Sequence, residues 1–170
     1  MFAFASLALA APCPAPVPLP DAALSPDGAA HVLARDATTV CWWIVDDRGD
    51  ARVAARWDRA RRDPLALTAL PDGRVVLVVF EPADAARGTA DRWRLVVREE
   101  GGGDTRVGGV LPAAPVRMLA NDEAPLVALV WADTAPVLVI DVPTGRPVVS
   151  AEVPGVGWRG ATPWRSDAPR

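Results

Sequence analysis

Side chains that commonly act as acids, bases or nucleophiles are scarce in this chain. The 170 residues include one histidine, His31, and one asparagine, Asn121, but no lysine, tyrosine or glutamine. Acid–base and nucleophilic catalysis usually needs several such groups within hydrogen-bonding reach of one another. His31 opens an expected strand, where a partly buried structural residue is more common than a catalyst. We therefore predict no catalytic residue, no cofactor and a protein that is not an enzyme.

Metal binding is not supported by the spacing of the acidic residues. Carboxylates gather in three turns, at residues 46–50, at residues 99–104 and at Asp122-Glu123. None of these has the Asp-x-Asp-x-Asp-Gly order of a calcium loop, and no Cys-x-x-Cys or Cys/His spacing indicates zinc. We expect solvated hairpin turns and no metal ligand.

The two cysteines, Cys13 and Cys41, allow two interpretations. In an exported protein they could pair, and the closed loop would be worth about 3 kcal/mol. Cys41 lies in the middle of an expected buried strand, however, whereas Cys13 precedes the fold. We expect a buried free thiol at Cys41, with the disulfide as the alternative.

Tryptophan and arginine side chains provide the candidate docking residues. Trp42 and Trp43 are adjacent in an expected strand and should face opposite sides of the sheet. Five of the seven tryptophans are explained by core packing. The other two stand beside arginines near the C-terminus, in a tail that is harder to bury. We predict that this tail docks a partner through Trp158, Arg159, Trp164 and Arg165.

These residues are set in a pattern that repeats three times. The turn residues Asp27, Asp72 and Asp122 lie 45 and then 50 positions apart. That period is close to the roughly 40–50 residues of propeller repeats.

Each repeat is expected to contain four strands and no long helix. Alternating or continuous Val, Ile, Leu and Trp runs lie between Gly-bearing turns, which is typical of strands joined by hairpins. The expected strands are residues 21–24, 31–35, 39–45 and 51–57; 65–70, 74–81, 93–98 and 105–111; and 116–120, 126–131, 137–142 and 146–153.

"LSPDG…TTVCWWIVDDRG" and "VLVIDVPTG" resemble repeats of the WD-repeat and related bacterial β-propellers. Blades of that class commonly carry a Ser-Pro-Asp-Gly turn and a third strand that ends in Trp-Asp followed by Thr-Gly. Trp43, Val96 and Ile140 fall on the Trp position, and only Asp141 falls on the Asp position. The Gly-His pair of the eukaryotic repeat has no counterpart, so the resemblance does not carry over its hydrogen-bonded network.

The resemblance implies an all-β, β-propeller-like fold of about three four-stranded antiparallel blades. Closed propellers usually have four to eight blades. Three repeats therefore imply a partial or open propeller, a ring completed by association of copies, or a truncated product. An open array would expose apolar sheet faces that favour association.

The ends of the chain suggest export. Residues 1–11 form a short apolar run containing Ala8-Leu9-Ala10, a candidate signal segment too short to span a bilayer. We assign residues 12–20 to a Pro-rich linker, residues 21–154 to the repeat domain and residues 155–170 to a flexible tail. A periplasmic or secreted location follows, without a membrane span.

Charge argues against a nucleic-acid partner. The net charge is −3, and the 18 basic residues are all arginine; binding to phosphate backbones needs a basic surface. We expect a solvated loop for Arg56, Arg59, Arg61 and Arg62.

We predict a non-enzymatic, exported protein-interaction or scaffold module that contacts a protein partner or itself. The alternative is a fragment or subunit of a larger propeller enzyme that binds a small ligand or sugar.

Overall fold

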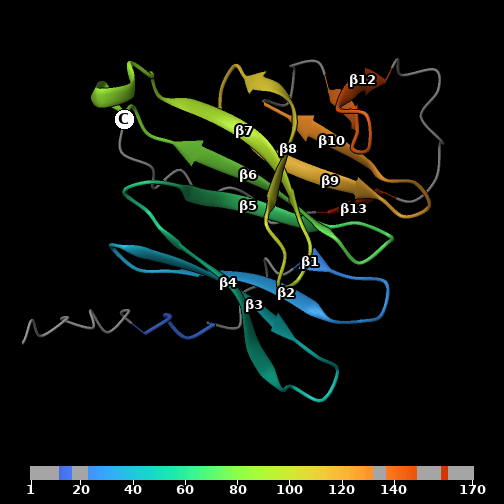
Figure 1. Cartoon of the computed structure of the whole chain (residues 1–170). Helices are drawn as coiled ribbons and strands as arrows, with labels where there is room; N and C mark the ends of the chain where they lie inside the picture. Colours follow the sequence, from blue (N-terminus) through green and yellow to red (C-terminus); the bar gives the residue numbers. More distant parts are fainter. Residues whose placement is uncertain (1–11, 17–22, 132–136, 149–157, 161–170) are drawn as a thin grey trace, which may run out of the picture.

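The computed structural model describes residues 12–16, 23–131, 137–148 and 158–160. Within these ranges the chain is all-β, apart from the one-turn 3-10 helix η1 (Ala85–Arg87). The strands form three antiparallel sheets, stacked one upon another (Figure 1). The predicted all-β class and the three four-stranded units are confirmed, and no sheet closes on itself.

Each repeat of the sequence forms one sheet, with its strands in chain order. Sheet 1 contains β1 (Ala23–Leu24), β2 (Ala30–Arg35), β3 (Thr39–Val45) and β4 (Ala51–Asp58). Sheet 2 contains β5 (Asp63–Ala69), β6 (Val75–Glu81), β7 (Arg92–Arg98) and β8 (Asp104–Leu111). Sheet 3 contains β9 (Arg117–Asn121), β10 (Leu126–Val130), β11 (Leu138–Asp141) and β12 (Arg146–Val148), and β13 (Trp158–Gly160) is added beside β9.

Turn residues set the first hairpin of sheets 1 and 2. Gly28 and Gly73 have φ of 86° and 84°, which glycine adopts without steric cost. The Asp27 carboxylate accepts a hydrogen bond from the backbone N–H of Ala29, and Asp72 accepts one from the N–H of Arg74. The Pro-Asp-Gly sequence thus forms the same kind of hairpin turn in sheets 1 and 2.

Sheet 2 is packed on both faces. One face meets sheet 1 in a core cluster that includes Trp42, Leu77 and Val96, and the other meets sheet 3 in a cluster that includes Val78 and Val127. Strand β6 is therefore apolar without alternation, as expected when both faces of a strand are buried. No core cluster of the described residues joins sheet 1 to sheet 3, so the three sheets form an open row.

The N-terminal segment covers the outer face of sheet 1. Cys13 and Cys41 form a disulfide, with their Cα atoms 5.9 Å apart. The Trp43 indole Nε1–H donates a hydrogen bond to the Pro14 carbonyl oxygen, 3.0 Å away. The expectation of a free thiol at Cys41 was wrong, because residues 12–16 return to the sheet instead of leading away from it as part of a linker.

Trp42 and Trp43 face opposite sides of sheet 1, and part of the C-terminal tail forms a strand of sheet 3. Trp42 is 1% exposed and packs toward sheet 2, while Trp43 faces the N-terminal segment, so the predicted opposite orientation is confirmed. In the tail, Trp158–Gly160 form β13, which pairs antiparallel with β9. These three residues thus belong to a sheet, and the rest of residues 155–170 lie outside the described residues.

Sheets 2 and 3 also meet through two glycines. The register of β7 and β8 shifts between Arg94 and Leu95, and this bulge places Gly108 against Gly145 in the turn between β11 and β12. A Cβ atom added to Gly145 would lie 2.6 Å from the Gly108 backbone nitrogen. Gly145 also has φ of 67°. This contact between backbones leaves no room for a side chain.

We expect Gly145→Ala to destabilise the fold by about 2 kcal/mol, through both the steric clash and the left-handed backbone. Gly49→Ala is the matched control, because Gly49 has φ of 86° but no atom within 4 Å of the added Cβ. Urea unfolding of both variants measures the difference. Equal losses of stability would contradict a packing role for the glycine contact.

Candidate functional site

His31 is buried and contacts Trp42. It is 4% exposed, and its Nδ1 accepts a hydrogen bond of 3.1 Å from the Trp42 indole Nε1–H. The two rings are stacked, with centroids 5.6 Å apart. Burial is the main cause that lowers the pKa of His31. The imidazole thus accepts a hydrogen bond from an indole inside the core that sheets 1 and 2 share.

A polar cleft lies where sheets 2 and 3 meet at the β7–β8 hairpin. Its volume is about 420 Å³. The side chains of Arg74, Glu99 and Thr144 contribute to its wall, together with the β8 backbone near Gly108. Thr144 already donates its hydroxyl hydrogen bond to Asp141, and Arg74 is paired with Asp72. The cleft therefore offers polar groups that are mostly engaged within the protein.

Among the described residues there is no group of three or more His, Cys, Asp or Glu side chains that could hold an ion. The acidic turns are not all solvated as predicted, however. Asp104 has a side chain only 10% exposed, because it is drawn into a cluster of arginines.

The arginine cluster is the most concentrated group of charges in the described part of the chain. It lies on the face of sheet 2 turned toward sheet 1, beside the core cluster that the two sheets share. Glu81, at the end of β6, occupies its centre with a side chain 9% exposed. Its carboxylate lies 2.9 Å from Arg62, 2.7 Å from Arg92, 3.3 Å from Arg94 and 3.4 Å from Arg106.

Asp104 is the second carboxylate that binds these arginines. Its carboxylate pairs with Arg62 and, at 2.5 Å, with Arg98. The Trp57 indole of sheet 1 donates a hydrogen bond of 3.3 Å to the same carboxylate, and the Arg98 guanidinium lies 5.2 Å above the Trp57 ring. Arg62 therefore bridges both carboxylates. The arginine cluster thus consists of Arg62, Arg92, Arg94, Arg98 and Arg106 together with Glu81 and Asp104.

The arginines keep Glu81 ionised. Burial by itself would raise the pKa of Glu81, but hydrogen bonds from Arg62 and Arg92 and the positive charge of Arg106 outweigh it and lower the pKa to about 2. The carboxylate consequently keeps its charge throughout the neutral and mildly acidic range.

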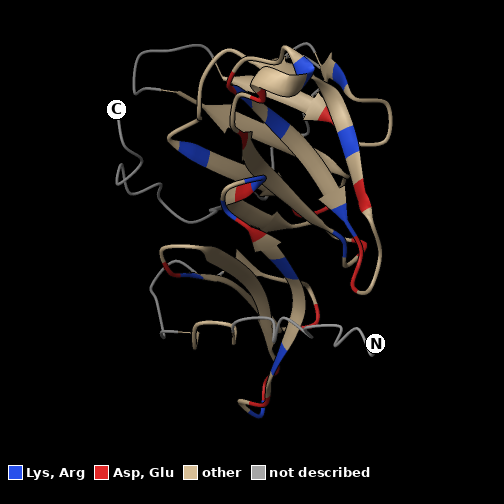
Figure 2. Cartoon of the chain, turned by 60° about the vertical axis from the view of Figure 1, so that its left-hand side comes forward, with Lys and Arg blue, Asp and Glu red and all other residues tan. Residues whose placement is uncertain are grey.

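The prediction that Arg62 lies in a solvated loop was wrong, and the other ion pairs of the arginine cluster were not predicted from the sequence. Arg62 was assigned to a solvated loop, yet its side chain is 26% exposed and bridges two buried carboxylates. The signal that could have found the cluster is the alternation Arg92, Arg94, Arg98 in β7, which places three arginines on one face of a strand. Elsewhere in the described part of the chain, acidic and basic residues are interspersed along the strands and turns (Figure 2).

The predicted docking residues are only partly placed. Trp158 and Arg159 lie in β13, where they pair with Asn121 and Ala120 of β9. Trp164 and Arg165 lie outside the described residues. The structure thus brings the first pair to the β9 side of sheet 3.

Comparison with family models, with curated proteins and with solved structures finds no match to the chain. The described residues include no helix long and apolar enough to cross a membrane.

Proposed function

We propose that the protein is a non-enzymatic, exported, propeller-like repeat protein of the WD-repeat-like class that acts as a protein-interaction or scaffold module. The observation that carries this proposal is the open row of sheets. Among the described residues, sheet 2 is covered on both faces by other sheets, whereas sheets 1 and 3 are each covered by a sheet on one face only. In a closed propeller every blade packs against two neighbours.

The two ends of the row differ, which favours contact through sheet 3. At sheet 1 the outer face is covered by residues 12–16 of the chain itself. At sheet 3 the outer face carries a separate apolar cluster formed by Leu126, Ala128 and Val139, which are themselves buried, at no more than 8% exposed. Val137, immediately before β11, is 55% exposed at this end, and we infer that a further sheet, supplied by a second copy or a protein partner, contacts the row there. Strand β13, which contains Trp158 and Arg159, extends the same sheet on the far side of β9.

Export is supported by the disulfide between Cys13 and Cys41. Disulfides form and persist in the periplasm and outside the cell, and they are rare in reducing compartments. We therefore place the protein in the periplasm or the medium.

Light scattering behind size exclusion tests the interaction proposal, with a chain that begins at residue 12. We expect a discrete dimer, in which two sets of three sheets associate through sheet 3. Val137→Glu, at an exposed position beside β11 of sheet 3, should shift the dimer to a monomer, and Val53→Glu, at an exposed position of sheet 1, should not. A stable wild-type monomer at about 100 μM would contradict self-association.

A second candidate function, a subunit of a larger propeller enzyme that binds a small ligand or sugar, rests on the polar cleft between sheets 2 and 3. A panel of neutral sugars tested by thermal shift decides it. Stabilisation by one sugar, abolished by Arg74→Ala at the cleft, would favour this candidate over the interaction module.

A further inference from the structure

The arginine cluster carries more positive charge than its carboxylates balance. Five guanidinium groups share ion pairs with two carboxylates, which leaves an excess of three positive charges. Four of the five side chains are no more than 29% exposed, so water screens this excess incompletely. Charges withdrawn from water are costly unless they are paired.

Hydrogen-bonding capacity is also in excess. Each guanidinium has five N–H donors, so the cluster has roughly three times as many donors as two carboxylates have lone pairs to accept them. The buried Nε of Arg98 has no hydrogen-bond partner. Arg106, 54% exposed, reaches Glu81 only at 3.4 Å. The cluster therefore retains donors for an additional acceptor.

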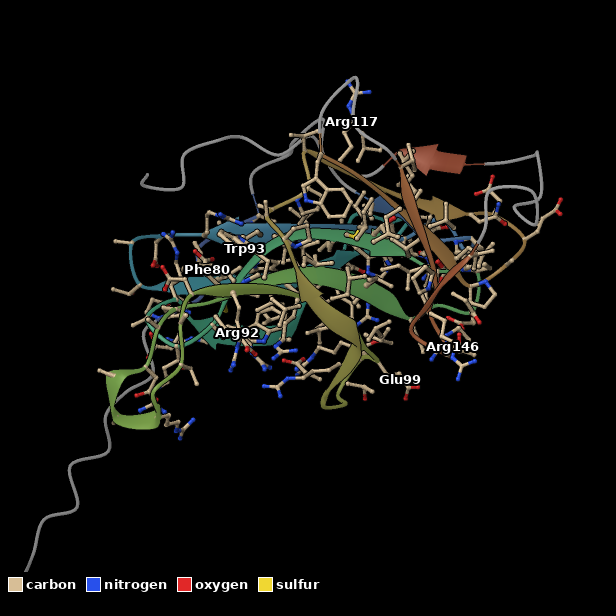
Figure 3. All side chains as sticks on the ribbon, turned by 90° about the horizontal axis from the view of Figure 1, so that it is seen from above. Phe80, Arg92, Trp93, Glu99, Arg117 and Arg146 are labelled. Atoms are coloured by element: carbon tan, nitrogen blue, oxygen red, sulfur yellow. A yellow bond between two sulfur atoms is a disulfide. The ribbon has the colours of Figure 1, made fainter. Side chains whose placement is uncertain are left out.

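The exposed side of the cluster is formed by neighbouring strands. Arg92 and Arg94 come from β7, Arg106 comes from β8, and all three converge on Glu81 from the same face of sheet 2. Figure 3 shows Arg92 among nitrogen-tipped side chains along one margin of the molecule, opposite the margin that carries Arg117. A ligand reaching this margin would meet several guanidinium groups at once.

We propose that the arginine cluster is a binding site for a phosphate or sulfate group, held by Arg92, Arg94 and Arg106. A tetrahedral dianion has the charge to offset most of the excess, and its oxygens match the paired N–H groups of guanidinium. Glu81 holds the arginines in place without neutralising them. The site does not depend on the proposed interaction function, since it lies between sheets 1 and 2 and away from the outer face of sheet 3.

Titration calorimetry in buffer of low ionic strength tests the proposal. The probes are sodium phosphate, sodium sulfate and glucose 6-phosphate, with glucose as the uncharged control. We expect saturable binding of at least one anion below about 10 mM and none of glucose. Binding of the inorganic ions identifies the free anion as sufficient, whereas binding of glucose 6-phosphate alone identifies a phosphate ester as the ligand. No saturable binding of any of the three anions overturns the proposal.

Variants separate the site from general charge effects. Arg106→Gln should weaken anion binding about ten-fold, because it removes a charge-assisted contact. Arg117→Gln removes the same charge from an exposed position of β9 and should change affinity by less than about two-fold. Arg106→Lys keeps the charge and loses the planar fork, so it provides an intermediate loss and a second variant if Arg106→Gln does not fold. Equal weakening by Arg106→Gln and Arg117→Gln, or a folded Arg106→Gln with unchanged affinity, rejects the site.

Discussion

Replacing Glu81 by Gln is expected to lower the free energy of unfolding by about 3 kcal/mol, which corresponds to a fall of roughly 6–12 °C in Tm. The substitution preserves the size of the side chain and removes the negative charge that four guanidinium groups share. Breaking a fully buried ion pair costs about 3–5 kcal/mol, and the partial exposure of the arginines places this case near the lower limit. Thermal and urea unfolding at neutral pH measure the loss.

Glu99→Gln is the matched control, because this substitution removes the same charge from an exposed residue in the β7–β8 turn (Figure 3). It should change the free energy of unfolding by less than about 0.5 kcal/mol.

The pH dependence of stability gives a second test of the role of the Glu81 charge. Since the pKa of Glu81 is lowered from 4.5 to about 2, its stabilising effect is complete above about pH 4.5 and is lost as the pH falls toward 2. The gap between wild type and Glu81→Gln should narrow over that range, and a gap independent of pH would point to packing instead of charge.

Removing the disulfide by the double substitution Cys13→Ser and Cys41→Ala is expected to cost about 3–4 kcal/mol. The bond closes a loop across a sequence separation of 28, and the chain-entropy model gives this magnitude for a loop of that length. The released segment would also uncover Trp43, which donates its indole hydrogen bond to Pro14. Urea unfolding of the oxidised wild type and of the variant measures the difference.

A reducing agent supplies the control for the disulfide. It should destabilise the wild type by a similar amount and leave the double variant unchanged. Thiol titration of the denatured, unreduced protein should detect no free cysteine. Two titratable thiols per chain would show instead that Cys41 remains a free, buried residue.

The strands could be predicted from the sequence because each is a short apolar run between turn residues: Pro fixes φ, and Gly accepts the positive φ that other residues avoid. The Pro-Asp-Gly turns at residues 26–28 and 71–73 set two hairpins, and the continuous apolar run of β6 is consistent with its burial on both faces in the structure. The stacking of three separate sheets then follows from the repeat.

Contacts between distant segments could not be predicted in the same way. Cys13 precedes the repeats in a proline-rich segment, and nothing in its neighbours indicates that the chain turns back onto β3. Likewise, Arg62 resembles its exposed neighbours in sequence, and only the packing of sheet 1 on sheet 2 brings it to Glu81 and Asp104. Both features depend on how the sheets are placed in space, which local periodicity does not encode.

The bond between Cys13 and Cys41 also determines how the molecule would be oriented if it were attached to a surface. Anything joined ahead of residue 12 enters beside the outer face of sheet 1, because residue 13 is fixed covalently to the centre of β3. An N-terminal tether would therefore hold the molecule by sheet 1 and direct sheet 3 away from the support. For immobilised binding assays, N-terminal attachment leaves the outer face of sheet 3 accessible.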